Sequence, residues 1–408
     1  MLVKESYPFL IGVPSFTCIN PFGDPPFRRR KKTIMNSSKH IHVIGCLVLG
    51  LVSGVWGGNY GSETCWFPAI YNFGDSNSDT GAGSAAFTAV HPPNGESFFG
   101  SLSGRACDGR LILDFLTEEL KLPYLSAYLN SLGSNYRHGA NFAVGGSSIR
   151  PGGYSPFDLG LQISQFKQFK YRTNVLYNQL SGNRTELFQS SLPRPDEFSK
   201  ALYTFDIGQN DLSYGFQHTS EEQVRSSIPN ILEIFNQAVQ QLYNEGARIF
   251  WIHNTGPIGC LPYSYIYYKS KQGNLDANGC VKPHNEIAQE YNRQLKEQVL
   301  VLKRNLPLAK FTYIDVYSAK YQLISDAKKQ GFVSPLLFCC GSYYGYHVNC
   351  GTQVTVNGTV YGNPCKNPSQ HVSWDGIHYS QAANLWVSKR ILSGSFSDPP
   401  VPIQKACF

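Results

Sequence analysis

Charged residues are scarce in this sequence, and it contains no basic surface stripe. They make up 15% of the 408 residues, whereas hydrophobic residues make up 42%, enough apolar material for a large core. Five of the positive charges behind the formal net charge of +7 lie together at residues 28–32. The remaining sequence is only mildly basic and has no run of Lys and Arg interleaved with aromatic residues. We therefore expect no nucleic-acid partner.

An apolar run long enough to span a bilayer, which takes about 20 residues, is also missing. One shorter run, residues 43–56, follows basic residues and precedes small ones, which is the layout of a secretory signal peptide. Met35 is the expected start of this leader, so residues 1–34 are either an extended gene-model start or an unusual upstream extension. We expect residues 1–58 to be extension plus signal peptide, residues 59–408 to be one domain, and the mature protein to be secreted without a transmembrane anchor.

The cysteines lack the spacing of a zinc site. Nine of the 11 cysteines follow residue 58, and the adjacent pair Cys339 and Cys340 is awkward for a single metal ion. Four disulfides and one unpaired thiol fit better, and we expect no metal or organic cofactor. Asn183 and Asn357 begin N-glycosylation sequons, which agree with secretion.

From about residue 66, short apolar runs alternate with amphipathic stretches. The expected strands are residues 69–73, 202–207, 248–252 and 311–314, and the expected helices are residues 111–120, 221–243 and 284–302. The strand candidates are bounded by Gly, Asp or Asn, as buried parallel strands usually are. This alternation predicts an α/β fold with an open, mostly parallel sheet covered by helices on both faces, that is, three α/β/α layers. We interpret the Cys- and Gly-rich residues 331–374 as a stapled loop region within that domain.

Ser76 follows the first expected strand, which ends at Phe73. Gly74 allows a tight turn, so the Ser76 hydroxyl is expected to project into a cleft at the strand-to-helix junction. A helix that starts just after Ser76 would direct free backbone N–H groups at a developing anion. In the alternative interpretation, Asp75, Ser76 and Asn77 only cap a helix.

Asp375 and His378 lie three residues apart near the C-terminus, with Gly376 between them. A serine hydroxyl is a poor nucleophile at neutral pH and needs a base with a pKa near 7, which His supplies. One turn can hold the carboxylate of Asp375 against the imidazole of His378 and stabilise the imidazolium during attack. An incidental His in a surface turn is the alternative.

Two further turns contain Gly and Asn after apolar runs, at residues 141–146 and 208–211. Acyl transfer needs donors directed at the oxyanion, and a Gly N–H and an Asn amide can both serve. Separately, both segments also fit ordinary turns.

In the order Ser, Gly, Asn and Asp-x-x-His, each after a predicted strand, these features resemble the SGNH/GDSL hydrolase family. The resemblance runs from about Phe67 to Ala383 and is closest to the plant GDSL esterase/lipases of the early nodulin-like and latex esterase branch. Further matching segments are residues 92–99, 104–105, 108–111, 254–260 and 338–341. The resemblance implies a flavodoxin-like three-layer fold and the hydrolysis of carboxylic esters through an acyl-enzyme.

Carried over residue by residue, the resemblance makes Ser76 the nucleophile, His378 the general acid/base and Asp375 the orienting carboxylate. The backbone N–H of Ser76, Gly146 and Asn210 become the oxyanion donors. Gly146 is preferred to Gly145 because the family's oxyanion Gly lies five residues after the motif's Asn, here Asn141. This branch more often has Ser where this chain has Cys107, which makes Cys107 the candidate for the unpaired cysteine.

The expected protein is thus a monomeric, extracellular (apoplast or cell wall) esterase or lipase. Its substrates would be acyl or acetyl esters of lipids, cell-wall polysaccharide or small metabolites. Acyl transfer to an alcohol is one alternative. A glycosidase is another, since relatives in this branch have been called α-fucosidases, although glycoside hydrolysis normally needs two flanking carboxylates. The third alternative is a lectin-like binding protein on the same fold.

Overall fold

The computed structural model describes residues 64–407 of the chain, except residues 102, 180–188, 271 and 344–346. The predicted leader at residues 1–58 and the sequon at Asn183 lie outside the described residues. Within the described part, no helix has both the length and the apolar character needed to cross a membrane.

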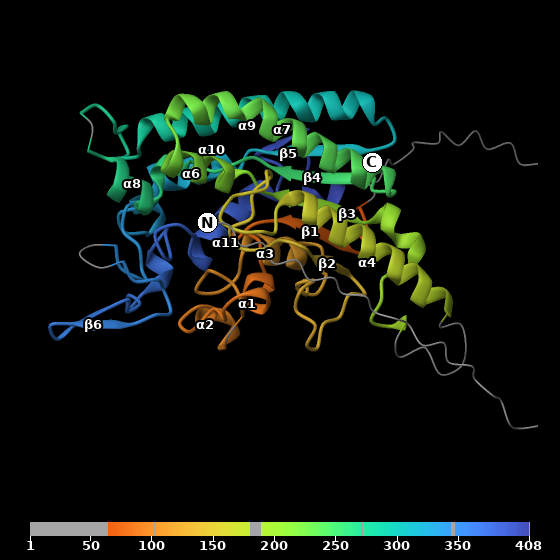
Figure 1. Ribbon diagram of the computed structural model, residues 1–408, viewed down its shortest axis with the longest axis horizontal. Helices are drawn as coiled ribbons and strands as arrows, with labels where there is room; N and C mark the ends of the chain where they lie inside the picture. The colour runs from red at the N-terminus through yellow and green to blue at the C-terminus, as the bar shows by residue number, and fades with distance from the viewer. Residues whose placement is uncertain (1–63, 102, 180–188, 271, 344–346, 408) are drawn as a thin grey trace, which may run out of the picture. The chain divides into compact units, whose positions relative to one another are not determined.

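A six-stranded sheet forms the centre of the domain (Figure 1). Its strands are β1 (Ile70–Gly74), β2 (Gly139–Asn141), β3 (Leu202–Asp206), β4 (Ile249–His253), β5 (Lys310–Ile314) and β8 (Ser397–Asp398). Their order is β2-β1-β3-β4-β5-β8, and only β8 pairs with its neighbour in the antiparallel sense. The mostly parallel sheet predicted from the sequence is confirmed, and its four predicted strands correspond to β1, β3, β4 and β5. The two- and three-residue strands β8 and β2 were not predicted.

Helices cover both faces of the sheet because the strands are apolar on both sides. Tyr71 and Phe73 of β1 belong to one core cluster, and Ile70, which points the other way, belongs to a second. The first cluster lies under α4 (Leu159–Gln179), α7 (Glu221–Asn244) and α9 (Lys282–Asn305), and the second under α3 (Ile112–Glu119), α10 (Val316–Ser325) and α11 (Gln381–Ile391). Figure 1 shows α7 and α9 as two long helices lying side by side along the sheet. The three predicted helices correspond to α3, α7 and α9.

Shorter elements complete the described chain. They are α1 (Ala82–Ala86), α2 (Glu96–Phe99), α6 (Gln209–His218), α8 (Pro262–Tyr268), the hairpin of β6 (Val354–Val356) and β7 (Thr359–Tyr361), and the 3₁₀ turns Pro195–Lys200, Ile258–Cys260, Ala327–Gln330, Pro368–Gln370 and Ile403–Lys405.

The order of the strands fixes where a site can form. The chain passes from β1 to β2 on one side and then returns to place β3 on the other side of β1. At such a reversal the connections after the two central strands diverge and leave a crevice at the carboxyl ends of the strands. Ser76 follows β1, and Asn210 lies in the helix that follows β3, so both residues lie at this crevice.

Four disulfides hold the described chain. Cys65–Cys407 joins its two ends, Cys260–Cys280 closes the segment after β4, and Cys339–Cys365 and Cys340–Cys350 staple the loop region at residues 331–374. Cys107 is buried and unpaired. The predictions of four disulfides and of Cys107 as the remaining thiol are therefore confirmed. Asn357 is exposed, with a φ of 49°, between β6 and β7.

Candidate active site

Ser76 lies in a tight turn that leaves β1. The N–H of Asp75 donates to the carbonyl of Asp206 at 3.2 Å, and the N–H of Ser78 donates to the carbonyl of Asp75 at 3.0 Å. Gly74 is required here because a Cβ on it would lie 2.3 Å from Ser78 Oγ and 2.7 Å from the Asp206 carbonyl. The prediction of a helix directly after Ser76 was wrong. Residues 75–78 form a turn, and α1 begins only at Ala82.

The delayed helix start is explained by Asp79, whose function sequence reasoning missed. The residue is only 5% exposed. Its carboxylate accepts the N–H groups of Gly81 and Ala82 on Oδ1, at 2.8 and 2.6 Å, and those of Gly83 and Gly145 on Oδ2, at 2.9 and 2.8 Å. Asp79 thus caps α1 and also joins the turn after β1 to the loop after β2. Its position just before Thr-Gly is a capping signal in the sequence, but its bond to Gly145, 66 residues away, leaves no local trace.

Ser76, His378 and Asp375 form a continuous chain of hydrogen bonds. His378 Nε2 lies 2.7 Å from Ser76 Oγ, although the two residues are 302 positions apart in the sequence. His378 Nδ1 lies 2.6 Å from Asp375 Oδ2. The side chains of His378 and Asp375 are only 15% and 17% exposed. The structure therefore brings together the three residues that were expected to act on the ester bond.

The turn that carries Asp375 and His378 is held by its own backbone. Asp375 Oδ1 accepts the N–H groups of Ile377 and His378 at 2.9 and 2.7 Å, which aims the other carboxylate oxygen at the imidazole. Gly376 has a φ of +94°, a conformation that other residues rarely adopt. The carbonyl of the buried Trp374 accepts the N–H groups of Cys339 and Cys340. The disulfide-stapled loop is therefore hydrogen-bonded to the residue that precedes this turn.

The charges of this group fit a proton acceptor. Burial alone would lower the pKa of His378, but the adjacent charge and hydrogen bond of Asp375 raise it above its ordinary value. Burial alone would raise the pKa of Asp375, but the charge and hydrogen bonds of His378 hold it below its ordinary value. Beside them, burial and the neighbouring Asp206 raise the pKa of Asp75 to about 7.

The expected oxyanion donors lie around Ser76. Within the described chain the backbone N–H groups of Ser76 and Gly146 have no hydrogen-bond acceptor, whereas the N–H of Gly145 is bound to Asp79. A Cβ on Gly145 would lie 3.9 Å from Ser76 Cβ, which places this loop beside the serine. Asn210 Nδ2 donates to the carbonyl of Ser147 at 2.9 Å and to Asp75 Oδ2 at 3.2 Å. These bonds fix the amide of Asn210 next to the Ser76 turn.

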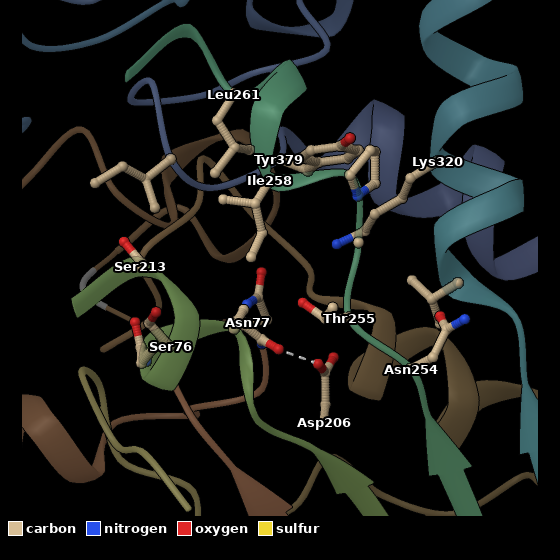
Figure 2. A pocket seen from close by; sticks show the side chains of 16 residues that line it. Ser76, Asn77, Asp206, Ser213, Asn254, Thr255, Ile258, Leu261, Lys320 and Tyr379 are labelled. Atoms are coloured by element: carbon tan, nitrogen blue, oxygen red, sulfur yellow. Dashed lines mark hydrogen bonds between the residues drawn. The ribbon is translucent and has the colours of Figure 1, made fainter. Parts of the chain in front are cut away.

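A cavity of about 70 Å³ opens beside Ser76 (Figure 2). Ser76 and Asn77 line one part of it. The other lining residues come from the end of β3 and from α6, from the segment after β4, from α10 and from both sides of His378. Elsewhere in the described chain, possible metal ligands converge at Cys339, Cys365 and His371 and at Cys260, Asp276 and Cys280. In both groups the two cysteines form a disulfide, so their sulfurs are not the thiolates that bind metal ions.

Residues 70–391 match the family described as GDSL-like Lipase/Acylhydrolase. The chain belongs to this family. Two GDSL esterase/lipases of Arabidopsis thaliana are 54% and 55% identical to it, each over 85% of this chain and over 90% and 92% of their own lengths. The α-L-fucosidase 3 of the same plant is 48% identical over 85% of this chain and 93% of its own length. The chain is a carboxylic ester hydrolase of the plant GDSL type, as its motifs predicted.

We expect Asp79→Asn to reduce kcat for p-nitrophenyl acetate by roughly 10- to 100-fold, because small displacements of catalytic groups have effects of this size. The amide would present an NH₂ group to backbone donors that need an acceptor, and so would loosen the loop at Gly145 from the Ser76 turn. Asp326→Asn, at an exposed ion pair with Lys329, is the matched control and should leave the rate unchanged. A full wild-type rate in folded Asp79→Asn protein would contradict this positioning role.

We also expect kcat/KM to rise with pH through the pKa of His378, above the ordinary value of 6.5, because only neutral imidazole can accept a proton. Asp375→Asn removes the negative charge that raises this pKa. The midpoint should therefore move to lower pH while the maximal rate falls, which pH–rate profiles of both proteins would measure. If Asp75 controlled this limb instead, Asp375→Asn would leave the midpoint in place.

Proposed function

We propose that this chain is a secreted serine esterase in which Ser76 attacks the ester carbonyl while His378 Nε2 takes its proton. Asp375 holds the imidazole and stabilises its charged form. The N–H groups of Ser76 and Gly146 and the amide of Asn210 stabilise the oxyanion. His378 then protonates the leaving alcohol, and water repeats the sequence on the acyl-enzyme. The observation that carries this proposal is the 2.7 Å contact between Ser76 Oγ and His378 Nε2.

Ser76→Ala should lower the turnover of p-nitrophenyl acetate by roughly 10⁴- to 10⁶-fold, as serine-triad knockouts do. His378→Ala should have a similar effect, and Asp375→Ala a smaller one, because backbone and water can partly replace an orienting group. A fluorophosphonate probe should label the wild type and not Ser76→Ala. Labelling that persists in Ser76→Ala would refute Ser76 as the nucleophile, and an unlabelled, inactive wild type would favour a lectin-like binding protein.

The proposed substrates are acyl or acetyl esters of lipids, cell-wall polysaccharide or metabolites. The relative named α-L-fucosidase 3 makes glycoside hydrolysis the second candidate. That chemistry uses two carboxyl groups that flank the scissile bond, whereas Asp206 is the only carboxylate among the residues that line the cavity at Ser76. Ester cleavage is therefore the better fit, and absence of turnover on p-nitrophenyl α-L-fucoside would agree with it. Product analysis with an added acceptor alcohol separates hydrolysis from acyl transfer.

We further propose that the leader ending near residue 58 exports residues 59–408 as a monomeric extracellular glycoprotein. The four disulfides and the exposed Asn357 support this proposal, because structural disulfides persist mainly in oxidising compartments.

Expression in plant cells from Met35 should release active enzyme into the medium, with its mature N-terminus near residue 59. Glycosidase treatment should lower the mass of the released protein, and Asn357→Gln should remove one of the glycans. Size-exclusion chromatography should give a monomer. Activity that is retained inside the cells, with an uncleaved N-terminus, would contradict the proposed export.

A further inference from the structure

The cavity beside Ser76 has apolar walls and a polar end. Its apolar lining comes from Pro257, Ile258, Leu261, Val316 and Ile377. At about 70 Å³ it has room for a few water molecules, and thus for an acyl group of a few heavy atoms.

The position of the cavity indicates which half of an ester it holds, if Ser76 is the nucleophile as proposed above. The leaving oxygen must lie next to His378 Nε2, which returns a proton to it. His378 is not among the residues that line the cavity, whereas Ser76 and the proposed oxyanion donor Asn210 are. The cavity therefore suits the acyl half of the substrate, and the alcohol lies outside it.

Lys320 of α10 supplies the polar end. The residue is only 8% exposed, and no acceptor or carboxylate within the described chain lies within hydrogen-bonding or ion-pair distance of its Nζ. Its contacts are with the ring of Tyr379, 4.5 Å from Nζ, and with Gly256, where a Cβ would lie 3.7 Å from Nζ. Figure 2 shows the side chain of Lys320 reaching into the cavity from the side opposite Ser76. Nζ therefore faces the cavity without an acceptor from the described chain, and an acceptor on a bound ligand can accept a hydrogen bond from it.

The groups around Lys320 indicate the charge of that acceptor. Asp206 also lines the cavity, but its carboxylate already accepts a hydrogen bond from Gln209 Nε2 at 3.2 Å and faces His253 Nδ1 at 3.4 Å. Burial lowers the pKa of Lys320, and the charges of Asp206 and Asp75 oppose this effect. The negative charges of these two acids would repel a ligand carboxylate, whereas they would not repel an uncharged oxygen.

Two further polar groups at the cavity also lack partners. The hydroxyls of Thr255 and Tyr379 have no hydrogen bond within the described chain, and both residues line the cavity. A hydroxyl both donates and accepts hydrogen bonds. These two oxygens are themselves fully buried, so Lys320 is the group that the cavity presents to a ligand.

We propose that the cavity binds a short acyl group that carries an uncharged oxygen, such as a hydroxyl or an ether, and that Lys320 is the residue that recognises this oxygen. Simple alkyl chains of the same length bind less well, because they remove water from Lys320 Nζ and offer no acceptor in exchange.

A pair of isosteric substrates tests this proposal. p-Nitrophenyl methoxyacetate and p-nitrophenyl butyrate have acyl groups with the same number of heavy atoms, and only the first has an ether oxygen. The ratio of their kcat/KM values is measured for the wild type, Lys320→Gln, Lys320→Met and the control Lys303→Met, whose lysine is exposed on α9. Comparing the ratio between proteins removes the different intrinsic reactivity of the two esters.

We expect Lys320→Met to lower the ratio of methoxyacetate to butyrate turnover by about tenfold or more, as loss of a hydrogen bond to a charged donor does. Lys320→Gln, which keeps an uncharged donor, should give an intermediate ratio, and Lys303→Met the wild-type ratio. If Lys320→Met fails to fold, a lowered ratio in Lys320→Gln still supports the proposal. A wild-type ratio in every folded Lys320 variant would overturn it and leave the esterase function intact. A wild type that prefers p-nitrophenyl hemisuccinate to methoxyacetate would overturn the assignment of an uncharged oxygen.

Failure of the esterase function itself has a different signature. In that case the wild type would hydrolyse neither ester and Ser76 would not react with a fluorophosphonate probe.

Discussion

The geometry around Ser76 depends on the buried carboxylate of Asp79. It accepts four backbone N–H groups, three from residues 81–83 and one from Gly145. A buried carboxylate is stable only when its oxygens are well hydrogen-bonded, so Asp79 and the two segments that it joins hold one another in place. Ser76 lies on one segment and the N–H of Gly146 on the other. Asp79 therefore fixes their relative position, although the two residues are not hydrogen-bonded to each other. The same bonds place the start of α1 several residues after Ser76.

A polar network inside the sheet extends this constraint to three strands. Asn72 on β1 donates to Asn141 on β2 at 2.7 Å and to Ser78 at 3.0 Å, and it accepts from Thr204 on β3 at 2.7 Å. All four residues are buried. An incompletely bonded network in this position would be strongly destabilising, so the network favours one register of the strand ends over its neighbours. The loops that carry the proposed catalytic and oxyanion groups start from those ends.

The sequence predicted the features that leave a local pattern. Buried strands such as β3 and long helices such as α7 have apolar periodicity, and the expected chemistry at Ser76 and His378 follows from short motifs in a fixed order. Strand β2 was missed because its three residues have no periodicity, and its place depends on close packing, since a Cβ on Gly139 would lie 1.8 Å from the carbonyl oxygen of Ile70. Asp79 and Lys320 were missed for the same kind of reason. What distinguishes them is the presence or absence of partners from distant segments, which only the folded chain defines.

Hydrogen-bond satisfaction separates two kinds of buried polar group near the crevice. Groups that position the chain, such as Asp79 and Asn72, have partners in the protein. Three donors near the proposed reaction path, the N–H groups of Ser76 and Gly146 and the amine of Lys320, have none within the described residues. The amide of Asn210 differs from them, because it already donates to Ser147 and Asp75. Natural proteins depart from complete satisfaction mainly where function requires it. When the surrounding backbone is fixed, small movements cannot bring protein acceptors to these donors. Asp79 and the strand network fix the backbone in this way. The rigidity of the scaffold therefore preserves the unmet hydrogen bonds that an ester substrate is proposed to complete.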